Sequence, residues 1–364
     1  MNRSELAHSL VSAPLALLLG GLALGAGGCL DPEPAGSASD STSAASATAA
    51  SDSTTGASGA SASASATGTD TDPAETEGTT AGGGTGGMID PNAPDELLFQ
   101  QALALYNAAD YAGADTLFKQ LWDMYPMSPR RDNAGYLHGR CRYETLDFSG
   151  AGGAFDQMIA AYPTSVFVDE SYYFWGRALF RIPDFGNALG KFDASVAADP
   201  AGTYVDNAYF YGGRSHYEMG DDAGAISALA SFESKYPMST YADNAAYYLG
   251  RARFSSGDYE GAGVAFVHVL DFAGSIYLDN ATYYAGRSDY ARGLLPSALT
   301  WFQKVVSTYP GSTYEDNALY YEVRVYVDQA NCPSANMVVS DLQTRFPGGA
   351  YTVKAQDYAV QGGC

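Results

Sequence analysis

A single pattern recurs seven times between residues 95 and 346, and it limits the folds available to this chain more than any other feature. Its most complete copy contains Asp243-Asn244-Ala245, Gly250-Arg251, Ala262 and Phe266. The leading aspartate returns at intervals of 37, 37, 37, 37, 36 and 37 residues, at Asp95, Asp132, Asp169, Asp206, Asp243, Asp279 and Asp316. Self-similarity at such a period is typical of proteins in which each unit packs only on its neighbours. The sequence therefore predicts one continuous core rather than two or three separate domains.

Each copy of the pattern predicts two helices. Most copies close with an aromatic residue and a proline, as at Tyr236-Pro237, and proline stops a helix. Two residues later Ser239 suits the N-cap of a first helix, which carries Asp243 in its first turns, where the helix dipole favours an acid. After a turn at Gly257-Asp258, a second helix places an alanine and a large apolar residue, four positions apart, on one buried face.

This pattern resembles the tetratricopeptide repeat. Gly250 matches the glycine of that repeat's first helix, Ala262 and Phe266 match its small and large positions in the second helix, and Pro237 matches its closing proline. The period differs, because tetratricopeptide repeats are 34 residues long and these are 37. The resemblance implies an all-α fold: a tetratricopeptide-like helical-hairpin solenoid of seven repeats (95–349), with a C-terminal capping helix and tail (350–364).

The longer unit also resembles repeats in bacterial envelope lipoproteins. The features that carry this resemblance are Tyr236-Pro237, Ser239 and Asp243-Asn244-Ala245, whose arrangement is similar to that in BamD-like proteins of β-barrel assembly and in Tol-Pal coordinators. The resemblance implies a protein of the cell envelope that binds another exported protein.

The N-terminus predicts export. Residues 1–28 have a polar start, an apolar run and a small-residue end, as in a lipoprotein-type signal peptide, and Cys29 stands where such a signal places the lipidated cysteine. Ala26 departs from the large aliphatic residue usual three places before that cysteine, so an ordinary cleaved signal and an uncleaved anchor remain alternatives. All three interpretations export the rest of the chain.

Residues 29–94 predict a disordered tether. Ser, Ala, Thr, Gly and Asp dominate this stretch, with no lysine or arginine and almost no large apolar side chain. Such a composition cannot bury enough apolar surface to offset the entropy lost on ordering. A lipid at Cys29 would then hold the repeats on a membrane at the end of a long flexible chain.

Charge and motifs exclude several function classes. The chain carries 19 basic and 41 acidic side chains, a net charge of −22, which disfavours nucleic acid as a partner. It has no glycine-rich phosphate loop, nucleophile elbow or zinc-protease motif, and its four histidines are not spaced as metal ligands. We therefore predict no cofactor, no metal site and no enzymatic activity.

One stripe of side chains could carry function. The first helix of successive repeats places an asparagine, an aromatic residue and an arginine along one line, which lies on the concave face in the resembling family. The candidate ladder consists of Arg140, Arg177, Arg214, Arg251, Arg287 and Arg324 with Tyr136, Tyr173, Tyr247, Tyr283 and Tyr320, and Phe210 at the equivalent site of repeat four. Such a groove could hold an acidic or extended peptide or stack on sugar rings. Alternatively, each arginine pairs with the repeated aspartate of its own or a neighbouring repeat and serves the fold.

The remaining cysteines predict a structural role. Cys332 lies at the turn inside repeat seven and Cys364 follows the capping helix. In a tetratricopeptide-like stack these points fall on the same edge, which makes them a candidate disulfide in an oxidising compartment. Cys141 lies on a first helix and is expected to be buried rather than reactive.

The sequence thus favours a non-catalytic scaffold or adaptor, anchored by lipid in the bacterial cell envelope and binding another exported protein through the concave face. The expected location is the outer membrane facing the periplasm, with the cell surface as an alternative. A second hypothesis is a module that binds glycan or peptidoglycan through the Tyr/Arg groove.

Overall fold

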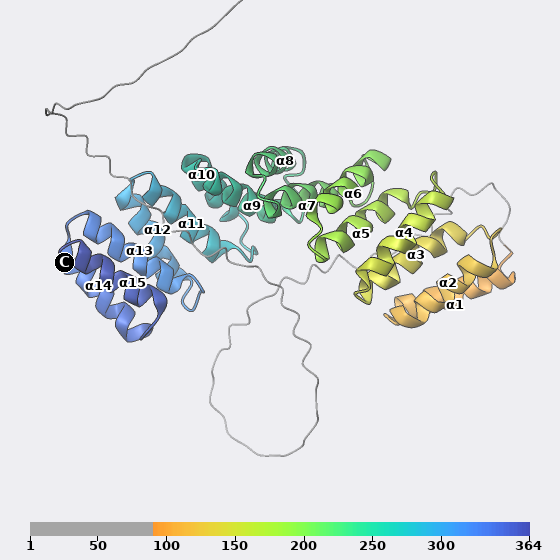
Figure 1. Ribbon diagram of the computed structural model, residues 1–364, viewed down its shortest axis with the longest axis horizontal. Coiled ribbons are helices and arrows are strands. Elements are labelled where there is room, and N and C mark those ends of the chain that lie inside the picture. The colour runs from red at the N-terminus through yellow and green to blue at the C-terminus, as the bar shows by residue number, and fades with distance from the viewer. Residues whose placement is uncertain (1–89) are drawn as a thin grey trace, which may run out of the picture. The chain divides into compact units, whose positions relative to one another are not determined.

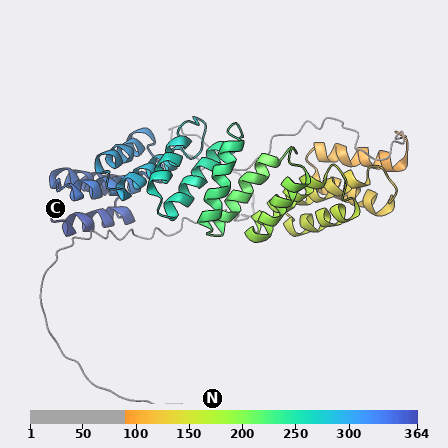
Figure 2. The ribbon, with the colours of Figure 1, turned by 90° about the horizontal axis from the view of Figure 1, so that it is seen from above.

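The computed structural model describes residues 90–364, which contain fifteen α-helices and no β-strand. Fourteen helices form seven hairpins that follow one another in chain order, and one helix packs beyond the last of them (Figures 1 and 2). The first helices of the hairpins are α1 (Pro94–Asn107), α3 (Arg131–Glu144), α5 (Val168–Arg181), α7 (Val205–Glu218), α9 (Ala242–Ser255), α11 (Leu278–Ala291) and α13 (Glu315–Asp328). The second helices are α2 (Tyr111–Met124), α4 (Phe148–Ala161), α6 (Phe185–Ala198), α8 (Asp222–Lys235), α10 (Tyr259–Val269), α12 (Leu295–Thr308) and α14 (Cys332–Arg345). The predicted all-α, tetratricopeptide-like fold is confirmed.

The second helix of each hairpin begins where the sequence predicted. In repeat five, Gly257 adopts a φ of +86°, a left-handed conformation that glycine reaches without steric cost. Asp258 then caps α10, because its carboxylate accepts a hydrogen bond from the Gly261 amide. Asp110, Asp147 and Asp221 cap α2, α4 and α8 in the same way.

The first helices begin later than predicted. We expected Ser239 to be an N-cap, but α9 starts at Ala242 and its N-cap, Tyr241, makes no side-chain capping bond. Ser239 Oγ instead accepts a hydrogen bond from the Tyr241 amide at 3.1 Å and donates one to Asp206 at 2.7 Å. The serine therefore closes the turn before the helix and links it to the previous repeat.

Glycine and phenylalanine set the distance between the two helices of a hairpin. Ala262 and Phe266 are fully buried, as predicted for one face of α10. A Cβ atom added at Gly250 would lie 2.7 Å from the Phe266 ring, so only glycine lets the two helices approach this closely. The same relationship joins Gly176 to Phe192 and Gly286 to Phe302.

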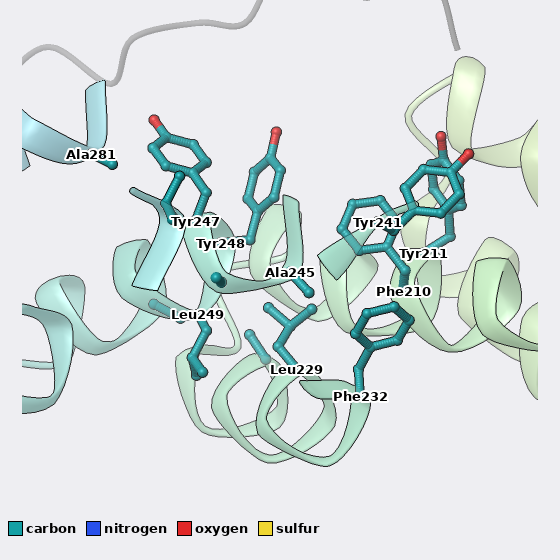
Figure 3. Packing of buried hydrophobic residues seen from close by; sticks show 14 of the residues in the cluster. Phe210, Tyr211, Leu229, Phe232, Tyr241, Ala245, Tyr247, Tyr248, Leu249 and Ala281 are labelled. Atoms are coloured by element: carbon teal, nitrogen blue, oxygen red, sulfur yellow. The ribbon is translucent and has the colours of Figure 1, made fainter. Parts of the chain in front are cut away.

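Aromatic stacking joins each repeat to the next. The rings of Tyr247 and Tyr277 stack with centroids 4.2 Å apart, and those of Phe210 and Tyr241 stack at 4.7 Å. Figure 3 shows the hydroxyl groups of Tyr247 and Tyr248 pointing to one side of the helix layer, while Phe232 lies on the other. The aromatic layer is thus part of the core, with the hydroxyl groups along one edge of it.

Helix α15 (Ala350–Gln361) ends the array and packs against α13 and α14. A disulfide between Cys332 and Cys364, whose Cα atoms are 4.9 Å apart, ties the end of the chain to the start of α14. The last helix is therefore held both by packing and by a covalent link.

Candidate functional site

The predicted ladder lies on the first helices from α3 to α13, and most of it is buried. Arg140, Arg177, Arg287 and Arg324 are between 2% and 9% exposed, while Arg214 and Arg251 are half-buried. Tyr136, Tyr173, Tyr247, Tyr283 and Tyr320 are buried as well. The structure brings these residues together as expected, but within the packed layer.

Each of four arginines donates a hydrogen bond to the tyrosine one helical turn earlier. The distances from Nη1 to the hydroxyl oxygen are 2.8 Å for Arg140–Tyr136, 2.7 Å for Arg177–Tyr173, 3.0 Å for Arg251–Tyr247 and 3.2 Å for Arg287–Tyr283. Residues four apart lie on the same helix face, which explains why the pairing repeats with the sequence.

Each guanidinium also covers an aromatic ring of the following repeat or, for Arg324, of the capping helix α15. The distances from Cζ to the ring centroid are 3.6 Å for Arg140–Phe174, 4.3 Å for Arg177–Tyr211, 4.8 Å for Arg214–Tyr248, 4.7 Å for Arg251–Tyr284, 4.7 Å for Arg287–Tyr321 and 4.9 Å for Arg324–Tyr358. A cation over a desolvated ring stabilises the contact by about 0.5–2 kcal/mol. The ladder is therefore a series of contacts between repeats.

Asparagines complete the same network. Asn207 donates to the hydroxyl of Tyr173 at 3.2 Å, and Asn280 donates to that of Tyr247 at 3.4 Å. Each of these hydroxyl oxygens thus accepts from an arginine of its own repeat and an asparagine of the next. Burial raises the pKa of Tyr136 well above its ordinary value of 10.0, so its hydroxyl stays protonated even at an alkaline pH where an exposed tyrosine begins to ionise.

The repeated aspartates do not play the part that the sequence suggested. One of the two alternatives for the ladder paired each arginine with a repeated aspartate, but the carboxylates of Asp132, Asp206 and Asp279 accept a hydrogen bond from a serine of the next repeat. The Oγ–Oδ2 distances are 2.7 Å for Ser165–Asp132, 2.7 Å for Ser239–Asp206 and 2.6 Å for Ser312–Asp279. Arg140 and Arg214 instead lie near glutamates one turn on, Glu144 and Glu218, at 3.7 and 3.4 Å.

The sequence also predicted a buried thiol at Cys141 and a lipid at Cys29. Cys141 is fully buried in α3, and this burial raises the pKa of its thiol to about 12. Cys29, the predicted lipidation site, lies outside the described residues, as do the predicted signal peptide and residues 29–89 of the predicted tether. Within residues 90–364, none of the helices has the length and apolar character needed to cross a membrane.

A cavity that the sequence did not predict lies between α6, α7 and α8. Its volume is about 220 Å³, and Gly212 forms part of its floor. The wall is mainly apolar, with Asp193 and His216 among the polar lining residues. The available signal was Gly212-Gly213, because repeats two, three, five and six carry only the second glycine of the pair and repeats one and seven carry neither. Glycines serve several purposes in a helix, so the pair alone did not indicate a cavity.

Comparison with known families gives two matches. Residues 91–188 match a family described as outer membrane lipoprotein, and residues 207–239 match the tetratricopeptide repeat. No curated protein matches the chain significantly.

A solved structure with a TM-score above 0.5 shows the same fold. The C-terminal part of a tetratricopeptide repeat-containing protein from Cytophaga hutchinsonii is 20% identical, with a TM-score of 0.57 over 71% of this chain and 98% of that one. A tetratricopeptide repeat protein from Parabacteroides merdae is 12% identical, with a TM-score of 0.46 over 73% and 98% of the two chains. Pseudomonas aeruginosa PilF is 12% identical, with a TM-score of 0.46 over 63% and 97%.

The repeated hairpins and the family match define a tetratricopeptide-like repeat protein. Its first repeats are, more narrowly, similar to an outer membrane lipoprotein family.

Proposed function

We propose that this protein is a non-catalytic scaffold of the bacterial cell envelope that binds another exported protein. The observation that carries the proposal is the match of residues 91–188 to an outer membrane lipoprotein family, within an array of interaction-type repeats. The lipoprotein-type N-terminus supports the same location, with Cys29 as the lipid anchor in the outer membrane.

The structure favours a scaffold over a site for chemistry. Four of the six ladder arginines donate a hydrogen bond to a tyrosine of the ladder, and all six guanidinium groups lie against an aromatic ring of the adjoining unit. Elsewhere Arg253 pairs with Asp258, and Lys191 covers Trp175. A partner therefore meets a surface whose balance is acidic, and we propose that it binds exposed side chains rather than the ladder arginines.

The same burial weighs against the glycan hypothesis. A sugar ring would have to stack on an aromatic face, but the ring faces of Tyr247 and Tyr284 are covered by Tyr277 and by Arg251. Glycan binding through the Tyr/Arg groove would require this packing to open.

A pull-down from detergent-solubilised envelope tests the proposal, with sedimentation on protein-free cell-wall sacculi alongside. We expect the full chain to retain a specific exported protein and to stay in the supernatant with sacculi. Sedimentation with bare sacculi, without a protein partner, would contradict the scaffold function and support glycan binding.

A further inference from the structure

In repeat three, a space beside the first helix is bounded by the two neighbouring second helices and is filled by an aromatic side chain. Trp175 of α5 lies in this space, against Gly152 of α4, where an added Cβ atom would be 2.9 Å from the indole nitrogen. From α6, Lys191 places its Nζ 3.3 Å from the centroid of the Trp175 ring. Burial lowers the pKa of Lys191, and the charge of Asp156 on α4 opposes that shift. A tryptophan and a lysine thus fill the space together, and the charge of an exposed aspartate acts on the lysine.

In repeat four two of these three residues are replaced by small ones. Gly212 stands 37 positions after Trp175, and Ala228 stands 37 positions after Lys191. The third residue is unchanged, because Asp193 stands 37 positions after Asp156. The cavity of about 220 Å³ lies at this place. Its apolar wall includes Leu189, Val196, Ala208 and Ala228. Leu189 stands where repeat three has Gly152, so the space stays open although one wall residue is larger.

Leaving this space open lowers stability, and the next repeat avoids it. Leu249 is the equivalent of Gly212 in repeat five, and it is 1% exposed. Filling an apolar cavity stabilises a protein, and replacing a helical glycine by a residue of higher helix propensity stabilises it further. An added Cβ at Gly212 would meet nothing nearer than Leu189 Cδ1 at 3.7 Å, so packing does not require glycine there.

Asp193 also lacks a neighbouring cation in the described part of the chain, whereas its equivalent in repeat three, Asp156, has Lys191 nearby. It is exposed at the rim and forms no hydrogen bond or ion pair with any residue between 90 and 364. The cavity therefore combines an apolar space, at the position that holds a tryptophan one repeat earlier, with a carboxylate that has no partner among residues 90–364.

We propose that this cavity binds an aromatic side chain of a partner protein, accompanied by a neighbouring lysine or arginine that pairs with Asp193. The inference rests on the proposed scaffold function and specifies the chemistry of its partner. The net charge of −22 favours a basic partner in the same way.

The chain itself cannot supply this aromatic side chain. Residues 1–89 contain no phenylalanine, tyrosine or tryptophan. In residues 90–364 every aromatic side chain is buried or half-buried in the fold. Neither the N-terminal segment nor the surface of a second copy therefore offers a free ring, and the occupant is a different protein.

The test uses the full chain and the peptide N-acetyl-Trp-Lys-amide, followed by ¹H–¹⁵N NMR of the Gly212 and Gly213 amides. We expect saturable shifts with this peptide, weaker binding by about threefold with N-acetyl-Trp-Glu-amide, and no binding of N-acetyl-Ala-Lys-amide. Gly212→Leu should weaken binding of the Trp-Lys peptide at least about tenfold, because the leucine side chain fills the cavity. In that variant, binding is followed through the amides of Gly213 and Ala208. Asp193→Asn should weaken it about threefold.

Matched controls are available on the same array. Gly153→Leu makes the same change at an exposed helical glycine with open space around it, and Asp271→Asn removes an exposed charge elsewhere. Both should bind the peptide as the unchanged protein does. Absence of peptide binding, or equal binding by Gly212→Leu, would overturn the inference, as would equal binding of the Trp-Lys and Trp-Glu peptides. If Gly212→Leu still retained the envelope partner in the pull-down, this inference would fail while the proposed function stood.

Discussion

The guanidinium carbon of Arg251 lies 4.7 Å from the ring centroid of Tyr284, which belongs to the next repeat. The same arginine donates a hydrogen bond to Tyr247 of its own repeat at 3.0 Å. One side chain therefore joins two units of the array, and the equivalent contacts recur from Arg140 to Arg324. Because each unit contacts only its neighbours, such contacts decide how cooperatively the array unfolds.

Removing Arg251 should destabilise the array. Arg251→Ala loses a partly buried hydrogen bond and a cation–ring contact, and we expect it to lower the free energy of unfolding by roughly 2–3 kcal/mol in urea titrations. Lys119→Ala is the control, because Lys119 forms only an exposed pair with Asp123, and it should change stability by less than about 1 kcal/mol. Unchanged stability of Arg251→Ala, with loss of partner binding, would show that the arginine serves recognition instead.

Two glycines should respond in opposite directions to the same substitution. Gly250→Ala places a Cβ atom 2.7 Å from the Phe266 ring, and we expect a loss of about 1–3 kcal/mol as the helices move apart. Gly153→Ala meets no atom within 4 Å and should gain up to about 1 kcal/mol from helix propensity. Melting temperatures of the two variants check this, and a common direction of change would count against the packing described.

Glu322 should make stability depend on pH. It is 6% exposed, and burial, helped by the charge of Asp341, raises its pKa from the ordinary value of 4.5 to about 8. Below pH 4.5 both the folded and unfolded chains hold the proton. Between pH 4.5 and 8 only the folded chain holds it, so this group's stabilising contribution falls by about 1.4 kcal/mol per pH unit as pH rises. Above pH 8 that contribution changes no further.

Glu322→Gln isolates this effect, because glutamine does not titrate. The difference in unfolding free energy between the variant and the unchanged protein, measured in urea at pH 5, 6.5 and 8, should grow in favour of the variant. A difference that is constant with pH would mean that Glu322 is charged in the folded protein.

Cys141 should be inert in the folded protein. It is fully buried, and its thiol pKa is raised to about 12, so little thiolate forms at pH 8. Peptide mapping after treatment with iodoacetamide should find Cys141 unmodified in buffer and alkylated in concentrated urea. Alkylation in buffer at the rate of a free thiol would show that α3 opens readily.

The sequence predicted what depends on period and residue size. Ala262 and Phe266 recur at fixed spacing because every hairpin needs the same close approach, and the structure buries both as predicted. The helix starts were placed too early, because Ser239 bonds to Asp206 of another repeat, a partner 33 positions away that no local rule identifies.

The candidate site was harder to predict. The position of Arg251 was evident from the repeat. Its guanidinium contacts the ring of Tyr284 rather than an aspartate, and this depends on how neighbouring repeats are rotated against each other. Gly250 holds the repeated glycine position and admits Phe266, whereas Gly212 stands one position before that glycine in its own repeat and leaves a cavity. The repeat register distinguishes the two glycines, but only the arrangement of three helices shows that one of them borders a cavity.

Photo-crosslinking in intact cells tests the central claim, that this array holds another envelope protein. A photoreactive residue would replace in turn Ser231, which lines the cavity, and the exposed Met127 and Met238. The account predicts an adduct with one exported protein from Ser231, identified by mass spectrometry and lost when Gly212→Leu is added. Absence of a protein adduct from all three positions, or adducts with cell-wall glycan alone, would contradict it.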